Sequence, residues 1–216
     1  MAVVALEPGY EGTVLDAREN FGPNQLVYLH WEKHLMFCAA LAFPLPPEMP
    51  FAALVGELIP AFRDRRYLRV DGRPLFLVYN IADVPDVAAS VAVWRDECVR
   101  AGVGDPYLCA VQRNAVDDPT PRGFDAAVEF PPIGHAAENI AARLNVTNPQ
   151  FRGSVFGYRN LVAHYLMQPR PPFRQFRGTT PMWDNTARRQ NDGMIVADST
   201  PEAFGVWMEH ALAQTR

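Results

Sequence analysis

Two short apolar segments on either side of an amphipathic one constrain the fold of this chain most. Residues 74–79 and residues 107–111 are near-continuous apolar runs. Between them, Asp86 can cap a helix, and Gly102 suits the left-handed position just past its end. The apolar face of that helix would carry Val87, Val91, Trp94 and Cys98. A strand, a helix and a strand within about thirty residues are typical of a parallel βαβ crossover, so the sequence predicts the α/β class.

The same pattern continues toward the carboxyl end. Residues 125–129 predict a third buried strand, which Pro131 and Pro132 end because proline lacks a ladder donor. Residues 179–184 predict a fourth strand, and Ile195 and Val196 a minor one. The Pro- and Arg-rich stretch 169–177 has the composition of an exposed linker.

Three more helices are expected around these strands. The first has apolar residues at helical spacing, with Pro60 near its end; these are Phe51, Leu54, Val55, Leu58, Ile59 and Phe62. A second covers residues 158–167. The third begins after the capping box at residues 199–202. Its predicted core face is Phe204, Trp207, Ala211 and Leu212.

Composition excludes several classes of protein. The 216 residues are 49% hydrophobic and 20% charged, an ordinary balance for a globular chain, and the net charge of −4 argues against a nucleic-acid partner. The cysteines have no paired spacing, so we expect reduced thiols and a cytoplasmic protein. No apolar run of about 18 residues predicts a transmembrane segment, and residues 1–9 do not resemble a signal peptide.

Residues 1–50 form a poorly legible amino-terminal segment, separate from the organised region 51–216. His30 and His34 would share one helix face, but the glutamate between them is misplaced for the zinc-protease pattern. No third ligand is indicated, so we predict no metal site and no cofactor.

Polar side chains stand at the predicted strand ends: Tyr79, Asn80, Gln112, Glu129, Trp183, Asp184 and Asn185, with Arg188 shortly after. The carboxyl ends of parallel strands face a common crevice, so these residues would form one rim. Carboxylates, amides and an indole without metal spacing indicate carbohydrate, because the indole stacks on a sugar ring while the polar groups bind its hydroxyls. Two alternatives stay open: Glu129 caps a helix or pairs with an arginine, and Trp183 is a packing residue beside a capped turn.

Four segments carry a family resemblance: residues 66–79, 110–112, 123–132 (Gly-Phe-Asp-Ala-Ala-Val-Glu-Phe-Pro-Pro) and 183–189 (Trp-Asp-Asn-Thr-Ala-Arg-Arg). In register and order they resemble the WbsX-like glycosyltransferases, a family related to glycoside hydrolase family 99 and associated with cell-surface polysaccharide and O-antigen loci. The resemblance covers about residues 51–216. It implies a (β/α)8-barrel relative, an oligosaccharide or other sugar-containing substrate, and a sugar-binding role for Gln112, Glu129, Trp183, Asp184 and Asn185.

The chain departs from the family pattern in one important respect. The family and its hydrolase relatives carry an Asn-Glu-Trp-x-Glu motif, whose two glutamates do the acid/base work in the hydrolases, and this sequence has no Asn-Glu-Trp. A barrel of this kind also needs about 250 residues. We therefore expect a partial member with an incomplete barrel, whose open sheet edges favour association with a partner.

Three functions follow from these observations. In the first, the chain is a glycan-processing enzyme and Glu129 is its candidate catalytic carboxylate. In the second, it is a non-catalytic remnant that at most binds carbohydrate. In the third, it binds no ligand.

Overall fold

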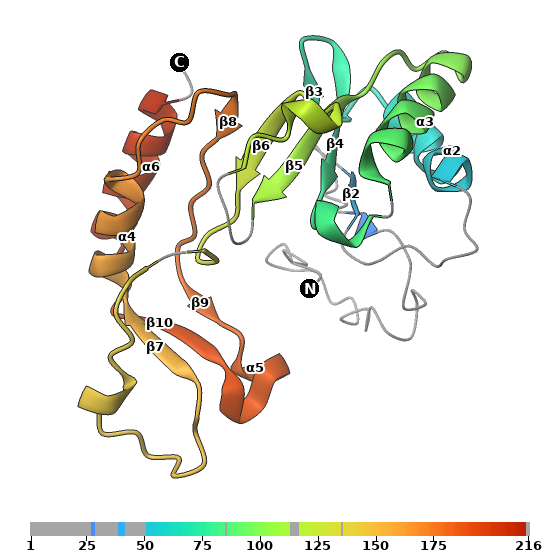
Figure 1. Ribbon diagram of the computed structural model, residues 1–216. Coiled ribbons are helices and arrows are strands. Elements are labelled where there is room, and N and C mark those ends of the chain that lie inside the picture. Colours follow the sequence, from blue (N-terminus) through green and yellow to red (C-terminus); the bar gives the residue numbers. More distant parts are fainter. Residues whose placement is uncertain are drawn as a thin grey trace. The chain divides into compact units, whose positions relative to one another are not determined.

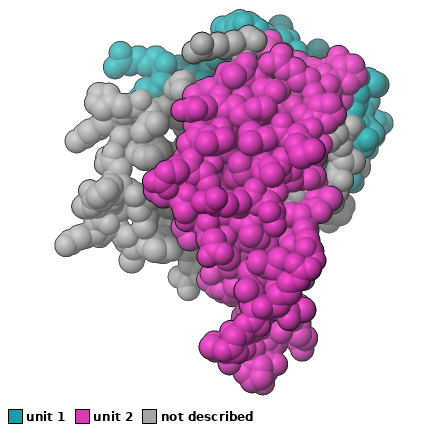
Figure 2. All heavy atoms as spheres, turned by 90° about the vertical axis from the view of Figure 1, so that its left-hand side faces the viewer, with its two compact units in different colours: residues 1–111, 117–127 teal, residues 112–116, 128–216 magenta. Residues whose placement is uncertain are grey.

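The computed structural model describes residues 27–28, 39–41, 51–84, 86–112, 117–134 and 136–214. The chain divides into two compact units (Figure 1). Unit 1 contains residues 1–111 and 117–127, and unit 2 contains residues 112–116 and 128–216. Figure 2 colours unit 1 teal and unit 2 magenta. The expectations for His30, His34 and Cys38 lie outside the described residues.

Unit 1 is built on a sheet whose central strands are parallel. Its order is β1 (Val27–Tyr28), β2 (Ala39–Leu41), β4 (Arg73–Val78), β5 (Tyr107–Gln112) and β6 (Ala126–Glu129). β4 runs parallel to both β2 and β5, β1 is antiparallel to β2, and the short β3 (Arg69–Val70) is antiparallel to β4. Most side chains of β4 and β5 are buried, which explains their near-continuous apolar sequence. The predicted βαβ crossover is confirmed.

Two helices cover this sheet and enclose the core of unit 1. α2 (Phe51–Arg63) packs against α3 (Val87–Arg100), and it continues through the exposed Pro60 to Arg63. In α2, Val55, Leu58, Ile59 and Phe62 are buried as predicted. Trp94 of α3 is fully buried, and its ring meets that of Phe76 edge to face with centroids 5.4 Å apart.

The ends of α3 follow the local rules that the sequence indicated. The Asp86 carboxylate accepts a hydrogen bond from the Ala89 N–H at 3.2 Å. Gly102 lies just past the carboxyl end with φ +74°, where a residue with a Cβ would be strained. Two 3-10 turns, η1 (Ile81–Asp83) and η2 (Thr120–Arg122), belong to the connections of this unit.

An ionic network ties α3 to the strands of unit 1. Arg73 and Arg95 each contact both Asp105 and Asp125, with N–O distances of 2.5–2.8 Å. The Leu108 N–H also donates to the Asp125 carboxylate at 2.8 Å. Burial raises the pKa of Asp125, but the hydrogen bonds from Arg73, Leu108 and Arg95 outweigh it and leave the pKa below its ordinary value. Asp125 immediately precedes β6, so the network anchors the strand that ends at Glu129.

Unit 2 contains a second, three-stranded sheet. β10 (Met194–Ala197) runs parallel to β7 (Ser154–Gly157) and antiparallel to β9 (Trp183–Asp184). Another strand, β8 (Gln175–Phe176), extends the first sheet by pairing with β6. The minor strand predicted at residues 195 and 196 is confirmed. Short helical turns lie in the connections: η3 (Ala141–Arg143), α5 (Thr186–Arg189) and η4 (Gln190–Asp192).

Helices α4 (Tyr158–Leu166) and α6 (Pro201–Gln214) supply most of the core of unit 2. The ring of Trp207 stacks on that of Tyr165 with centroids 4.9 Å apart. The Thr200 hydroxyl caps α6 by accepting from the Ala203 N–H at 3.2 Å. The helix start is confirmed, but the cap lies one residue later than the Ser199–Glu202 pair of a capping box. Leu212, expected in the core, is 55% exposed, so this prediction was wrong.

The strands lie in two sheets, so the predicted strand 179–184 does not share a sheet with the strands of unit 1. The described strands do not close a barrel. Only Trp183 and Asp184 of the predicted strand 179–184 pair with a neighbour, and that neighbour is antiparallel. The residues before them form a loop in which the Thr180 backbone carbonyl accepts from the Tyr158 hydroxyl at 2.7 Å. Proline at 181 cannot donate to a ladder, which is consistent with the shorter strand.

Candidate functional site: the cavity around Glu129

A cavity of about 460 Å³ lies in unit 2 at the ends of β5 and β6. Gln112 and Glu129 contribute one part of its wall, and the segment after Glu129 contributes another. His164, Tyr165 and Gln168, from α4 and the turn after it, complete the wall together with residues 169–173, Gln175 and Arg177. Two of the residues predicted to form a rim therefore line one cavity, because β5 and β6 are neighbours in the sheet.

Glu129 is held by an arginine that is distant in sequence. Its carboxylate accepts from the Arg177 guanidinium at 2.5 Å and from the Gly178 N–H at 3.1 Å. Both partners are well buried: the Glu129 side chain is 11% exposed and that of Arg177 is 6% exposed. Arg177 also donates to the carbonyls of Gln168 and Pro169, each at 3.1 Å. The alternative in which Glu129 pairs with an arginine is thus the arrangement observed.

Gly178 allows this arrangement because it has no side chain. A Cβ at this position would lie 2.5 Å from Cδ of Pro131 and 2.6 Å from the backbone oxygen of Glu129. Those atoms belong to the end of β6 and the residues after it, which leave no room for a methyl group. The close backbone approach sets the position of Arg177 against the Glu129 carboxylate.

Amide and phenol groups add hydrogen-bonding capacity to the cavity. Gln175 Nε2 donates to Gln112 Oε1 at 2.5 Å, and the buried Gln175 Oε1 has no hydrogen-bond partner in the described part of the chain. The Tyr165 hydroxyl donates to the Ile133 carbonyl at 2.9 Å. Burial and the charge of Glu129 raise the pKa of Tyr165, so this phenol stays neutral. His164 and Gln168 face each other with Nε2 atoms 3.1 Å apart.

The arrangement suits the recognition of hydroxyl groups. A fixed carboxylate accepts hydrogen bonds, amides both donate and accept them, and a guanidinium donates. The Glu129 carboxylate already accepts from Arg177 and Gly178. Among the described residues, no group of three or more His, Cys, Asp or Glu is placed to hold a metal ion.

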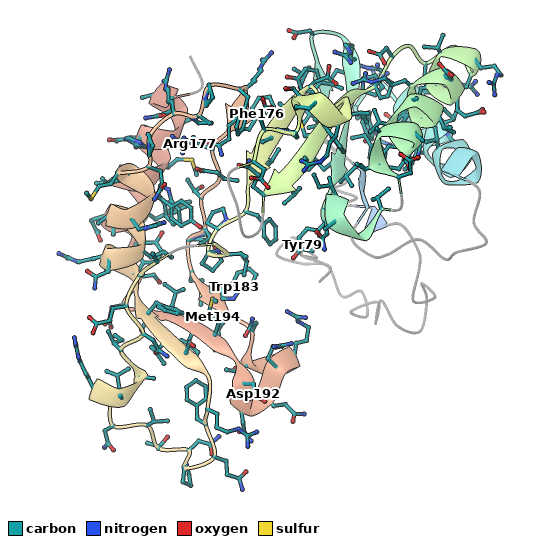
Figure 3. All side chains as sticks on the ribbon, viewed as in Figure 1. Tyr79, Phe176, Arg177, Trp183, Asp192 and Met194 are labelled. Atoms are coloured by element: carbon teal, nitrogen blue, oxygen red, sulfur yellow. The ribbon has the colours of Figure 1, made fainter. Side chains whose placement is uncertain are left out.

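The other residues of unit 2 that were predicted at the rim do not line the cavity around Glu129; these are Trp183, Asp184, Asn185 and Arg188. Trp183 packs against the core of Tyr158 and Trp207, and its buried Nε1 has no hydrogen-bond partner among the described residues. The Asp184 carboxylate accepts from the backbone and hydroxyl of Thr186 at 2.8 and 2.7 Å. Figure 3 shows Arg177 after β8 and Trp183 on β9.

Asn185 has a structural partner as well. Its Oδ1 accepts from the Met194 N–H at 2.7 Å, while Arg188 is exposed on α5. Neither residue lines the cavity around Glu129. The observed contacts match the alternative of a packing indole beside a capped turn.

Tyr79 and Asn80 follow β4 and belong to unit 1. Both are half-buried. Asn80 precedes η1 with an extended backbone and makes no side-chain cap to it. A role for these two residues in sugar binding stays a prediction.

Pattern reasoning missed the residues that complete the cavity. The composition of residues 169–177 indicates an exposed linker, but this stretch contains β8 and the buried Arg177, so the interpretation is wrong for residues 175–177. Tyr165 and His164 fell inside a predicted helix without any motif. No local signal indicates Arg177, because its partner is 48 residues earlier in the chain.

These features define an α/β protein with parallel strands and a polar cavity built on a buried carboxylate. The family model described as "Glycosyltransferase WbsX" matches residues 48–216. The chain therefore belongs to the WbsX glycosyltransferase family.

Two curated relatives carry the name WxcX and come from Xanthomonas campestris pv. campestris. The protein of strain B100 is 36% identical over 165 residues, which cover 74% of this chain and 24% of the relative. That of a second strain is 35% identical over the same length. The chain thus spans 24% of the length of these relatives. A solved structure described as a glycoside hydrolase-like protein is 14% identical, with a TM-score of 0.48, covering 77% of this chain and 48% of the other.

The amino-terminal part resembles a different family. The model described as "Phenol hydroxylase" matches residues 16–65. DmpO of Pseudomonas sp. strain CF600, the oxygenase component of phenol 2-monooxygenase, is 48% identical over 50 residues, covering 23% of this chain and 42% of that protein. The two family matches overlap at residues 48–65, which contain α2.

No helix among the described residues combines the length and apolar character needed to cross a membrane.

Proposed function

We propose that the chain takes part in glycan processing and that the cavity around Glu129 binds the sugar. Membership of the WbsX glycosyltransferase family is the observation that carries this proposal. The cavity supports it, because a buried carboxylate, three amides and a phenol supply the donors and acceptors that sugar hydroxyls require.

Each group has a defined part in this proposal. Arg177 and Gly178 hold the Glu129 carboxylate in one position, where its remaining lone pairs accept from sugar hydroxyls. The unpaired oxygen of Gln175 accepts another hydrogen bond, and Gln112 positions that amide. The side chain of Phe130 and the prolines of the cavity wall contact the C–H face of the sugar ring.

The proposal extends to the architecture of the protein, its pathway and its cellular compartment. The sheets correspond to part of a (β/α)8 barrel, supported by the parallel pairs β4–β5 and β7–β10 with helices between their strands. We assign the protein to cell-surface polysaccharide biosynthesis in the cytoplasm. The family resemblance supports the first assignment, and the buried free thiols of Cys98 and Cys109 support the second.

A second candidate function is sugar binding without turnover. Among the described residues that line the cavity, Glu129 is the only acidic one, and its carboxylate is paired with Arg177. Glycoside chemistry normally divides its acid and base roles between two carboxylates. This observation favours binding over catalysis by the chain alone.

The test measures binding and turnover by the full chain on a panel of oligosaccharides. Glu129→Gln keeps the shape and removes the charge, while Glu138→Gln makes the same change at a side chain that is 58% exposed. We expect calorimetric binding to weaken at least about tenfold in Glu129→Gln and to persist in Glu138→Gln. Gln112→Leu, which leaves the ion pair in place, should also weaken binding.

Turnover distinguishes the two candidates. Glycosyl transfer or hydrolysis by the wild-type chain, lost in Glu129→Gln, supports the enzyme. Saturable binding without turnover supports the binding protein. A folded chain that binds no oligosaccharide of the panel would refute both.

A further inference from the structure

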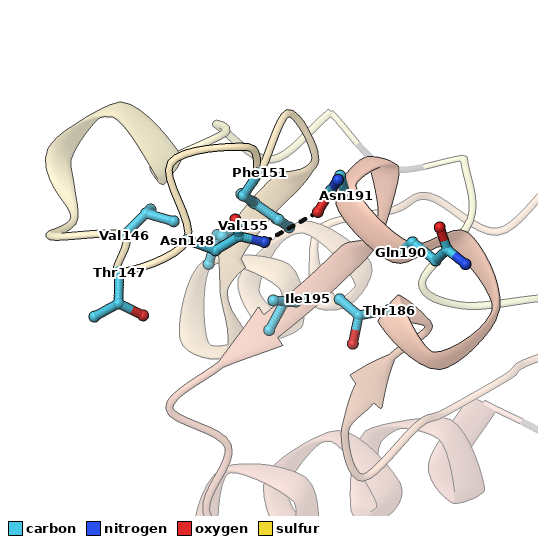
Figure 4. Close-up of a pocket in the computed structure, with 9 residues that line it drawn as sticks. All are labelled: Val146, Thr147, Asn148, Phe151, Val155, Thr186, Gln190, Asn191 and Ile195. Carbon is cyan, nitrogen blue, oxygen red and sulfur yellow. Dashed lines mark hydrogen bonds between the residues drawn. The ribbon is translucent and has the colours of Figure 1, made fainter.

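Unit 2 contains a second cavity, of about 430 Å³, between two segments that are distant in sequence (Figure 4). One side is the loop that contains residues 146–151, and the other is the turn from Thr186 to Asn191. Val155 of β7 and Ile195 of β10 lie between them. We call this cavity the neutral pocket.

Hydrogen bonds join the two sides of the neutral pocket. The Arg152 N–H donates to the Asn191 carbonyl at 2.7 Å, and the Ser154 N–H donates to the Gly193 carbonyl at 2.9 Å. Asn148 Nδ2 donates to Asn191 Oδ1 at 3.0 Å across the pocket wall. A Cβ at Gly153 would lie 2.0 Å from the Gly193 oxygen, so the backbones are in close contact. The pocket therefore has walls that are held in place before any ligand binds.

The lining mixes polar and apolar side chains and carries no charge. Its polar members are Thr147, Asn148, Thr186, Gln190 and Asn191. Its apolar members are Val146, Phe151, Val155 and Ile195. The nearby ion pair between Arg152 and Asp192, 3.3 Å apart, is already self-compensated and does not line the pocket.

This combination matches one class of ligand. Amides and hydroxyls both donate and accept, as sugar hydroxyls do, and an aromatic ring with aliphatic neighbours covers the C–H face of a sugar. A charged ligand would give up hydration without meeting an opposite charge in the wall.

Gln190 adds an independent sign of function. Its backbone lies at φ +50° and ψ −121°, a conformation that residues with a Cβ rarely adopt. Its exposed side-chain amide lines the pocket. Strained residues of this kind persist where the surrounding structure holds them, and they cluster at binding sites.

We propose that the neutral pocket binds an uncharged saccharide unit, at a site separate from the cavity around Glu129. The substrate class rests on the proposed function in glycan processing, and the pocket extends it to a second sugar position. Asn148 and Asn191, already hydrogen-bonded to each other, present their remaining donors and acceptors, and Gln190 supplies an exposed amide. Phe151 offers the apolar surface on which the ring lies.

The test is an NMR titration of the ¹⁵N-labelled full chain. The probes are the methyl glycosides of mannose, galactose, glucose and rhamnose, with glucuronate and glucosamine as charged comparisons. The neutral glycosides should shift the side-chain NH₂ signals of Asn148, Gln190 and Asn191, and the charged sugars should shift them less. Gln190→Gly removes the amide and suits the positive φ, so it should fold while weakening binding about fivefold.

Two further variants separate this site from others. Asn160→Ala removes an exposed amide of α4 that does not line the pocket, and it should leave the titration unchanged. Glu129→Gln should also leave these shifts intact even where it abolishes binding at the other cavity. The two proposals can therefore fail separately: sugar binding in the neutral pocket does not depend on Glu129, and sugar binding at Glu129 does not depend on the neutral pocket.

Three results would overturn the proposal: no shift with any of the four neutral glycosides, equal shifts with charged sugars, or equal weakening by Asn160→Ala and Gln190→Gly.

Discussion

The ionic network of unit 1 allows one prediction to be worked out in detail. Replacing Asp125 with Asn keeps the shape of the side chain but removes its negative charge. Arg73 and Arg95 then keep only Asp105 as a charged partner in this network. The Asp125 carboxylate accepts from Arg73 at 2.8 and 3.1 Å, from Arg95 at 2.8 Å and from the Leu108 N–H at 2.8 Å. Its side chain is 18% exposed. The substitution should therefore destabilise unit 1.

The size of the effect follows from what Asn retains. A hydrogen bond to a charged group contributes about 1.5–3 kcal/mol when buried. Asn keeps one acceptor oxygen, and Asp105 still pairs with both arginines, although its own side chain is 44% exposed and so screened by solvent. We expect a loss of about 2 kcal/mol in the free energy of unfolding at pH 7.

The pH dependence gives a second check with a definite sign. Because the pKa of folded Asp125 is lowered, its stabilisation is fully present above the unfolded value of 3.8 and is lost as the pH falls through the folded pKa. The difference between wild type and Asp125→Asn should stay level above about pH 5 and shrink below pH 3.8.

Urea unfolding at several pH values, with hydrogen exchange of peptides from β5, measures this difference in unit 1. Asp96→Asn, at an exposed position of α3, is the matched control and should change stability by less than about 0.5 kcal/mol. The reasoning fails if Asp125→Asn costs no more than this control, or if its cost does not fall in acid.

Three other predictions concern unit 2 and the cysteines. Gly178→Ala should weaken sugar binding and destabilise unit 2, because its methyl group would meet the Glu129 oxygen at 2.6 Å. Gly205→Ala, with open space around the helical position, should be neutral or stabilise by about 0.5–1 kcal/mol in the same calorimetric and urea experiments. Trp207→Ala should cost about 3–5 kcal/mol in urea unfolding, because the 2% exposed indole leaves a cavity; a cost below 1 kcal/mol would contradict this packing. Burial raises the pKa of Cys98 to about 12, so iodoacetamide at pH 8 should alkylate this thiol only after unfolding, and rapid labelling of the native chain would refute its burial.

Much of the local structure was predictable from the sequence. β4 and β5 are buried on both sides, so their residues are apolar without alternation. Asp86 and Thr200 cap helices through atoms three residues away, and such short-range chemistry is visible in a sequence. The family resemblance predicted for about residues 51–216 is confirmed by the match to residues 48–216, whereas sequence reasoning did not find the phenol hydroxylase-like stretch at residues 16–65.

The candidate site was predictable only in part. Gln112 and Glu129 share a cavity because they end neighbouring strands, a relation that the βαβ pattern implies. Trp183 was expected beside them, but β9 pairs with β10 in a second sheet, and nothing in residues 179–184 specifies which strand will be the partner.

The sequence by itself determined the long helices, the central strands β4, β5 and β6, and the family. Only the tertiary structure decided that Arg177 would hold Glu129, and that the backbone at Gly178 would reach the end of β6. The physical reason is range: propensity, capping and apolar periodicity act over a few residues. A buried ion pair between residues 48 apart depends on how whole elements pack.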